Sequence, residues 1–157
     1  ALNNVSFIGR VKNPYLFMSK IDLLVVPSIR EPLGNVCLEA GLCRVPVLAA
    51  NVDGLPEIIE NKISGELIDA TEEISINTVQ GAISLPEFVV NPVKGNLSAP
   101  KQINPSILAK RILKLSSQDD KLKYYSNELN KKVKNKFSID RYRRELHKMY
   151  REIDIKG

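Results

Sequence analysis

The segment 28–40 contains the residues whose types and spacing are best suited to chemistry. Glu31 is followed by Gly34, and Glu39 lies a turn or so into the helix that we expect to begin near Gly34. Glycine lets the backbone turn tightly and lets a ligand approach closely. A helix N-terminus offers free N–H groups and a positive dipole to a diphosphate, and the carboxylate of Glu39 can accept hydrogen bonds from a diol such as a ribose. These residues alone predict a phosphorylated, hydroxyl-rich ligand.

Simpler interpretations of the same residues stay open. A carboxylate such as Glu39 near a helix start also complements the helix dipole, and Gly34 also fits as an ordinary turn residue. Glu57 is equally an acid at the start of a helix. Arg10 is equally an exposed arginine, and we expect His147 to face solvent from the polar side of the last helix.

Strands and helices must position this segment. Alternation that ends in glycine predicts a short strand over 5–9. Short apolar runs predict strands over 22–27 and 45–50, and a last strand is predicted over 65–69. Helices are predicted between them over 13–20, 34–43 and 54–60. Alternation of this kind with short links indicates the α/β class with a parallel sheet. Ligands bind beyond the carboxyl ends of such strands, so we expect a site where the second and third strands end.

Residues 71–104 break this alternation. They contain Pro86, Pro92, Pro100, Gly81 and Gly95, and they have no helical period. A connection of this length without structure is unusual in a compact domain. We expect an irregular, loosely ordered surface insertion, with a short strand around 87–90.

Helices are expected again after residue 104. Asn104 fits an N-cap with Pro105 at the first helical position, and Ser138 fits the cap of the last helix. An amphipathic stripe runs along that last helix, formed by Ile139, Tyr142, Leu146, Met149 and Ile153.

Charge and cysteine content narrow the class of protein further. The chain has 157 residues and a net charge of +5, and its basic residues gather in residues 101–157. Such a tail fits a solvated helix face or binding to an anionic membrane surface. Binding to nucleic acid is not expected, because the tail has no aromatic residues interleaved on a polar face that could stack on bases.

Cys37 and Cys43 do not have a metal-binding spacing, so we expect buried thiols in a reducing, cytoplasmic compartment. No signal peptide or membrane-spanning run is visible in the sequence.

Six pieces of sequence, in order, resemble a known family. Glu31 and Glu39, with Pro32-Leu33-Gly34 between them, resemble the E-x7-E signature of glycosyltransferase family 4, the group 1 type with the two-domain GT-B architecture. The segments 5–9 and 22–28 resemble the family strands that precede this signature, and the segments 45–47 and 53–58 resemble the family segments that come after it. The resemblance covers residues 3–70 well and residues 105–153 loosely.

The resemblance implies a fold, an activity and site residues. The fold would be the Rossmann-like doubly wound parallel sheet of the C-terminal GT-B half, followed by C-terminal helices. The family transfers a sugar from a nucleotide donor with retention of configuration and without a metal cofactor. Carried over, Glu31 contacts the donor sugar near the reacting carbon and Glu39 binds the ribose. The amides of Gly34, Asn35 and Val36 face the diphosphate or sugar, and Arg10 and Val11 line the base.

Three departures from the family pattern shape our expectations. First, the earlier Gly-Arg strand, the Lys that follows it and the acceptor-binding N-terminal half are absent, so we expect a piece of a larger enzyme, inactive alone. Second, Asp53-Gly54 stands in place of the usual Gly-Gly. Third, the 71–104 insertion is longer than the usual link.

The resemblance also places strand 5–9 two strands away from strand 22–27. This spacing predicts an incomplete or rearranged sheet.

We therefore predict the donor-binding part of a glycosyltransferase that acts on a glycan or lipid-linked acceptor in surface polysaccharide synthesis. Its expected partners are a nucleotide sugar, the N-terminal domain and an anionic membrane surface. The protein would be cytoplasmic and would bind peripherally to the inner face of that membrane. The alternative is a non-catalytic α/β module that binds a nucleotide or a partner without turnover. Binding that distinguishes a nucleotide sugar from other ligands would separate the two.

Overall fold

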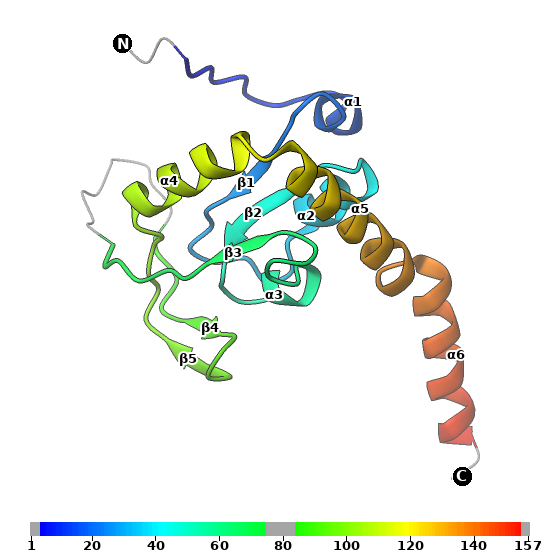
Figure 1. Ribbon diagram of the computed structural model, residues 1–157. Coiled ribbons are helices and arrows are strands. Elements are labelled where there is room, and N and C mark those ends of the chain that lie inside the picture. Colours follow the sequence, from blue (N-terminus) through cyan, green and yellow to red (C-terminus); the bar gives the residue numbers. More distant parts are fainter. Residues whose placement is uncertain (1–3, 75–83, 155–157) are drawn as a thin grey trace.

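The computed structural model describes residues 4–74 and 84–154, and its core is a small parallel sheet (Figure 1). The sheet has the order β1-β2-β3, formed by Leu24–Val26, Val47–Ala50 and Glu66–Ile68. Both pairs are parallel, with Val25 opposite Leu48 and Ala49 opposite Leu67. All four residues of β2 are buried, as expected for a central strand covered on both faces. The predicted α/β class with a parallel sheet is confirmed.

Helices connect and cover these strands. Those of the sheet region are α1 (Pro14–Met18), α2 (Asn35–Leu42) and α3 (Leu55–Ile58); α4 (Pro105–Ser116), α5 (Asp119–Lys136) and α6 (Ile139–Asp154) follow the insertion. The predicted caps are present: the Asn104 side chain accepts hydrogen bonds from the amides of Ser106 and Ile107, and Ser138 accepts one from Arg141. Cys37 of α2 shares the core with Tyr125, Leu129 and Val133 of α5.

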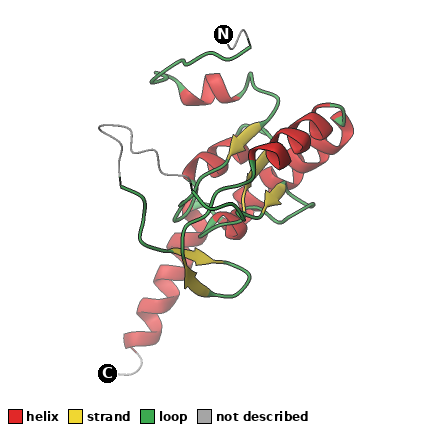
Figure 2. Ribbon diagram, turned by 90° about the vertical axis from the view of Figure 1, so that its left-hand side faces the viewer, coloured by secondary structure: helices red, strands yellow, loops and turns green. Residues whose placement is uncertain are grey.

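The prediction of a strand over 5–9 is wrong. These residues form no strand, and Phe7 is 94% exposed. A strand needs a neighbour to pair its backbone groups, and among the described residues no strand lies beside this segment. The sheet is therefore incomplete, as expected, because the N-terminal segment is not paired with it. This segment lies at the opposite end of the molecule from the strands β4 (Val89–Asn91) and β5 (Asn96–Ser98) (Figures 1 and 2).

The insertion contains more regular structure than predicted. Its expected strand is present as β4 (Val89–Asn91), which pairs with β5 (Asn96–Ser98) in an antiparallel hairpin, hereafter hairpin β4–β5. Val89 and Ile103 are buried, and a bridge between Glu72 and Gln102 ties the two ends of the insertion. Apolar anchors thus hold parts of a segment for which the sequence predicted one short strand in an otherwise irregular insertion. Residues 75–83 lie outside the described residues.

A buried carboxylate joins β3 to the helices that follow the insertion. Glu66 is 2% exposed. Its oxygens accept hydrogen bonds from Arg111 Nη1 at 2.8 Å, Lys121 Nζ at 2.7 Å and Tyr125 Oη at 3.0 Å. Burial alone would raise the pKa of Glu66, but the hydrogen bonds from Lys121 and Tyr125 and the charges of Lys121 and Arg111 outweigh it, so this pKa is lowered. The cluster fixes α4 and α5 on the sheet.

We predict that Glu66→Gln lowers the free energy of unfolding of the full-length protein by about 2 kcal/mol at pH 7, because the amide cannot satisfy all three donors. The pKa of Glu66 in the folded protein is lower than the value of about 4.3 for an unfolded glutamate. Ionised Glu66 therefore stabilises the folded state at pH values above about 4.3, and this stabilisation is lost as the pH falls through the folded pKa. Urea unfolding at pH 7 and near pH 3.5 should show the difference between wild type and variant shrinking in acid. The control is Glu73→Gln, which breaks an exposed pair with Lys101 and should change stability by less than about 0.5 kcal/mol.

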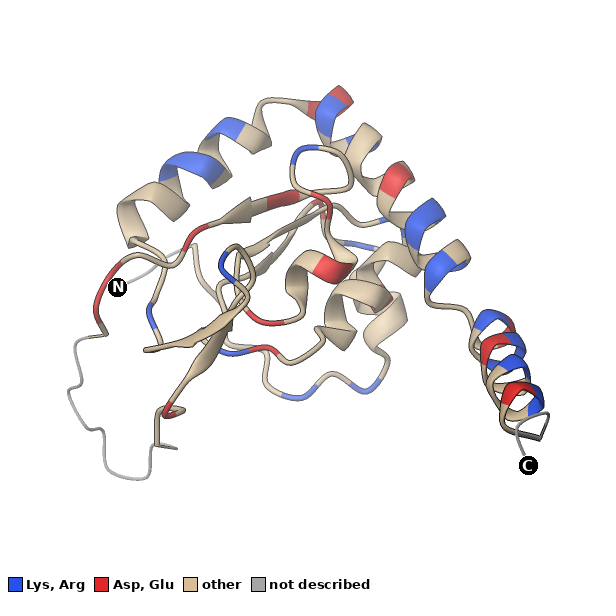
Figure 3. Cartoon of the chain, turned by 90° about the horizontal axis from the view of Figure 1, so that it is seen from below, with Lys and Arg blue, Asp and Glu red and all other residues tan. Residues whose placement is uncertain are grey.

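The last helix, α6, leaves the body of the molecule (Figure 1). Its predicted amphipathic stripe is largely exposed: Ile139, Tyr142, Met149 and Ile153 are each at least 59% exposed. Lys and Arg residues recur along α4, α5 and α6 (Figure 3). Within the described part of the chain, no helix has the length and apolar character needed to cross a membrane.

Candidate functional site

The loop after β1 holds Glu31 by its backbone and leaves its carboxylate free. The Glu31 amide donates to Asp53 Oδ2 at 2.9 Å, and the Glu31 carbonyl accepts from the Gly54 amide at 3.2 Å. Across residues 4–74 and 84–154, the half-buried Glu31 carboxylate makes no hydrogen bond or salt bridge. A carboxylate fixed in place but without a protein partner is prepared for a ligand.

Gly34 shapes the start of α2 as the sequence predicted. It is the N-cap, with φ +93° and ψ +54°, a left-handed conformation that favours glycine. A Cβ at this position would lie 2.7 Å from Leu55 Cδ2, so any larger residue would also push against the side chain of Leu55 in α3. The amides of Asn35 and Val36 follow, and in the described residues neither donates a hydrogen bond. They are free donors at the positive end of a helix.

Glu39 lies in the second turn of α2 and is half-buried. Like Glu31, its carboxylate has no hydrogen-bond or salt-bridge partner in the part of the chain that the structure describes. Helix α2 therefore carries free amides at its first turn and a free carboxylate one turn further on. This arrangement can accept hydrogen bonds from hydroxyl groups and donate them to an anion, as the sequence predicted.

Asp53 joins the two loops at the carboxyl ends of β1 and β2, and sequence reasoning missed this role. Besides the Glu31 amide, its carboxylate accepts a hydrogen bond from the Val90 amide at 2.7 Å through Oδ1. Its φ of +46° is one that few side chains adopt and that aspartate tolerates. The next residue, Gly54, touches the loop after β1 so closely that a Cβ there would lie 2.2 Å from the Pro32 carbonyl oxygen. The sequence did contain a signal for this role, because Asp53 stands where the similar family has glycine.

In the described residues, no hydrogen bond joins Arg10 or Val11 to the other predicted site residues. They lie on the N-terminal segment beside α1, with Arg10 exposed and Val11 half-buried. Figures 1 and 2 place that segment away from hairpin β4–β5, which lies beside the Glu31 loop. Their assignment to the base of a nucleotide stays a prediction. No group of three or more metal-binding side chains occurs in the described residues.

The two cysteines differ in their surroundings. Cys37 of α2 is fully buried and Cys43 is half-buried; both are free thiols. Burial, and then the negative charge of Glu31, raise the pKa of Cys37 to about 12. Cys37 is therefore a neutral core residue, and the charge effect indicates that the Glu31 carboxylate lies close to α2.

Comparison with known proteins identifies similar sequences and folds. The family model of the group 1 glycosyl transferases matches residues 1–83. The capsular polysaccharide biosynthesis glycosyltransferase CapM of Staphylococcus aureus is 27% identical over 147 residues, which cover 94% of this chain and 30% of CapM.

Two solved structures show the same GT-B fold. Anabaena HepE (Alr3699) in complex with UDP-glucose superposes with a TM-score of 0.67 at 20% identity, over 96% of this chain and 33% of that one. Sucrose-phosphate synthase of Thermosynechococcus elongatus gives 0.68 at 21% identity, over 97% of this chain and 31% of that one. This chain therefore spans about a third of the length of these relatives.

Proposed function

Because the chain belongs to the group 1 glycosyl transferases, we propose that it is the nucleotide-sugar-binding part of a retaining glycosyltransferase. The observation that supports this proposal most is the pair of half-buried carboxylates of Glu31 and Glu39. Neither has a hydrogen-bond or salt-bridge partner in the described part of the chain, and the free amides of Asn35 and Val36 lie between them in the sequence. A nucleotide sugar has matching groups in the same order: sugar hydroxyls, a diphosphate and a ribose diol.

The proposed roles follow this order along α2. Glu31 faces the donor sugar near the reacting carbon, the amides at the helix start bind the diphosphate, and Glu39 accepts from the ribose. Arg10 and Val11 are proposed to line the base when the parts of the protein outside this chain place them there. Binding of the diphosphate by helix amides needs no metal, and we propose that the enzyme uses none.

The likeness to known proteins supports the choice of donor and process. HepE has been determined in complex with UDP-glucose, and CapM is named for capsular polysaccharide biosynthesis. We propose a nucleoside diphosphate sugar as donor and a glycan or lipid-linked sugar as acceptor, bound by an N-terminal domain outside this chain. The basic C-terminal helices would face an anionic membrane surface on the cytoplasmic side.

The proposal is tested by titrating the full-length protein with UDP-glucose, UDP-galactose, GDP-mannose, UDP and GDP in a calorimeter. One nucleotide sugar should bind saturably, with a dissociation constant of about 1 μM to 1 mM, and should keep its affinity when EDTA is added. Binding that ignores the sugar, or no binding to any of these compounds, would favour a non-catalytic module. A large loss of affinity in EDTA would overturn the metal-free part of the proposal.

A further inference from the structure

A pocket of about 260 Å³ lies where hairpin β4–β5 meets the loops after β1 and β2. Its lining includes Arg30, Asp53, Glu57, Phe88, Val89 and Val90. Arg30 and Asp53 come from the loops after β1 and β2, beside Glu31, and Glu57 comes from α3, which follows the second of these loops. The other three come from the insertion. The insertion thus forms one wall of the pocket at the predicted ligand-binding edge of the sheet. None of the site residues predicted from the sequence lies in this insertion.

Hydrogen bonds fix this wall to the loop that carries Glu31. The Asp53 amide donates to the Val90 carbonyl at 3.1 Å, and Asp53 Oδ1 accepts from the Val90 amide at 2.7 Å. The other oxygen of the same carboxylate accepts from the Glu31 amide at 2.9 Å. Val89, the first residue of β4, is buried. The hairpin is therefore held against the site rather than projecting freely into solvent.

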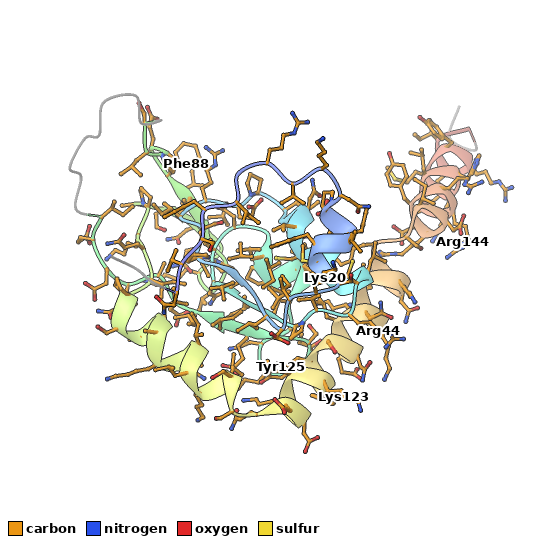
Figure 4. All side chains as sticks on the ribbon, turned by 90° about the horizontal axis from the view of Figure 1, so that it is seen from above. Lys20, Arg44, Phe88, Lys123, Tyr125 and Arg144 are labelled. Atoms are coloured by element: carbon orange, nitrogen blue, oxygen red, sulfur yellow. The ribbon has the colours of Figure 1, made fainter. Side chains whose placement is uncertain are left out.

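The lining combines one aromatic surface with separate donors and acceptors. Phe88, which directly precedes β4, is 47% exposed, and Figure 4 shows it well apart from Tyr125 of α5. In the residues that the structure describes, the side chains of Arg30 and Glu57 form no hydrogen bond or salt bridge. The guanidinium offers donors and the carboxylate offers acceptors.

This combination fits a sugar ring better than an anion. A pyranose has an apolar C–H face that packs on an aromatic ring and hydroxyls that both donate and accept. A phosphate would meet the negative charges of Glu57 and Asp53 beside the single cation of Arg30, which disfavours it. We propose that this pocket is a saccharide subsite, with Phe88 as its stacking surface and Arg30 and Glu57 as its hydroxyl partners. The proposal rests on the glycosyltransferase function proposed above, and the bound ring belongs to the donor or to the acceptor.

The test uses the full-length protein with three substitutions. Phe88→Ala removes the aromatic surface, Phe88→Tyr keeps it, and Val93→Ala alters a 78% exposed residue in the hairpin turn that does not line the pocket. The donor probes are UDP-glucose, UDP-galactose and GDP-mannose, with UDP and GDP as references without a sugar. The acceptor probes are the octyl glycosides of glucose, galactose and N-acetylglucosamine, titrated with the better-binding nucleoside diphosphate present at saturation.

Phe88→Ala should weaken binding of one sugar probe by about 3- to 10-fold, without changing the affinity for UDP or GDP. Phe88→Tyr and Val93→Ala should bind like the wild type. Loss confined to nucleotide sugars assigns the subsite to the donor, and loss confined to octyl glycosides assigns it to the acceptor. Unchanged affinity of Phe88→Ala for every probe, in a protein that does bind nucleotide sugars, overturns the subsite alone. A wild-type protein that binds no nucleotide or nucleotide sugar overturns the proposed function as well.

Discussion

Glu31→Gln is expected to lower the saturated rate of the full-length enzyme by on the order of 100-fold or more, with little change in donor affinity. Asp53 and Gly54 hold the Glu31 backbone through hydrogen bonds of 2.9 and 3.2 Å, so the loop that carries its carboxylate is fixed, and no partner within residues 4–74 and 84–154 neutralises that carboxylate. Positive charge develops at the reacting carbon of the donor sugar as the leaving group departs. A fixed negative charge stabilises that state more than it stabilises the ground state, and glutamine removes the charge while keeping the shape.

Donor saturation curves, measured at saturating acceptor, separate the rate from the donor constant. The matched control is Glu60→Gln, which removes the same charge from an exposed residue just after α3 and should leave both quantities unchanged. If Glu31→Gln keeps the full saturated rate, the role assigned to Glu31 is wrong.

The elements that position this site could be predicted because their signals are local. The apolar runs that became β1, β2 and β3 indicate buried parallel strands wherever they occur, and Asn104 and Ser138 cap helices through their own neighbouring amides. Strand 5–9 failed for the opposite reason. Its alternation is a real pattern, but strand pairing depends on a neighbouring strand, and residues 4–74 and 84–154 do not supply one.

The parts of the fold and of the site that sequence reasoning missed depend on contacts between distant residues. Glu66 occurs in an apolar strand, yet its partners lie 45 to 59 positions further along the chain. Asp53 similarly contacts Glu31, 22 positions earlier, and Val90, 37 positions later. Composition labelled the insertion irregular, although its buried Val89 and its bonds to Asp53 make part of it a wall of the site. In both cases the visible clue was a charged residue where a local pattern favours an apolar or small one.

The position of Glu39 leads to a different expected result. It lies one turn beyond the free amides of Asn35 and Val36, so a donor whose diphosphate binds those amides would place its ribose within reach of the carboxylate. A hydrogen bond from a hydroxyl to a charged acceptor contributes roughly 1.5–3 kcal/mol. Glu39→Gln should therefore weaken donor binding by roughly 10- to 100-fold, with a smaller loss of rate at saturation.

Titrations with the donor and with the free nucleoside diphosphate check this assignment for Glu39→Gln. Both ligands carry the ribose, so both should lose affinity by a similar factor, whereas Phe88→Ala should leave the free nucleotide unaffected. The contrast between these two variants distinguishes a ribose contact from a sugar contact within one experiment. If Glu39→Gln leaves both dissociation constants unchanged, Glu39 only complements the dipole of α2, and the ribose must be bound by residues elsewhere in the protein.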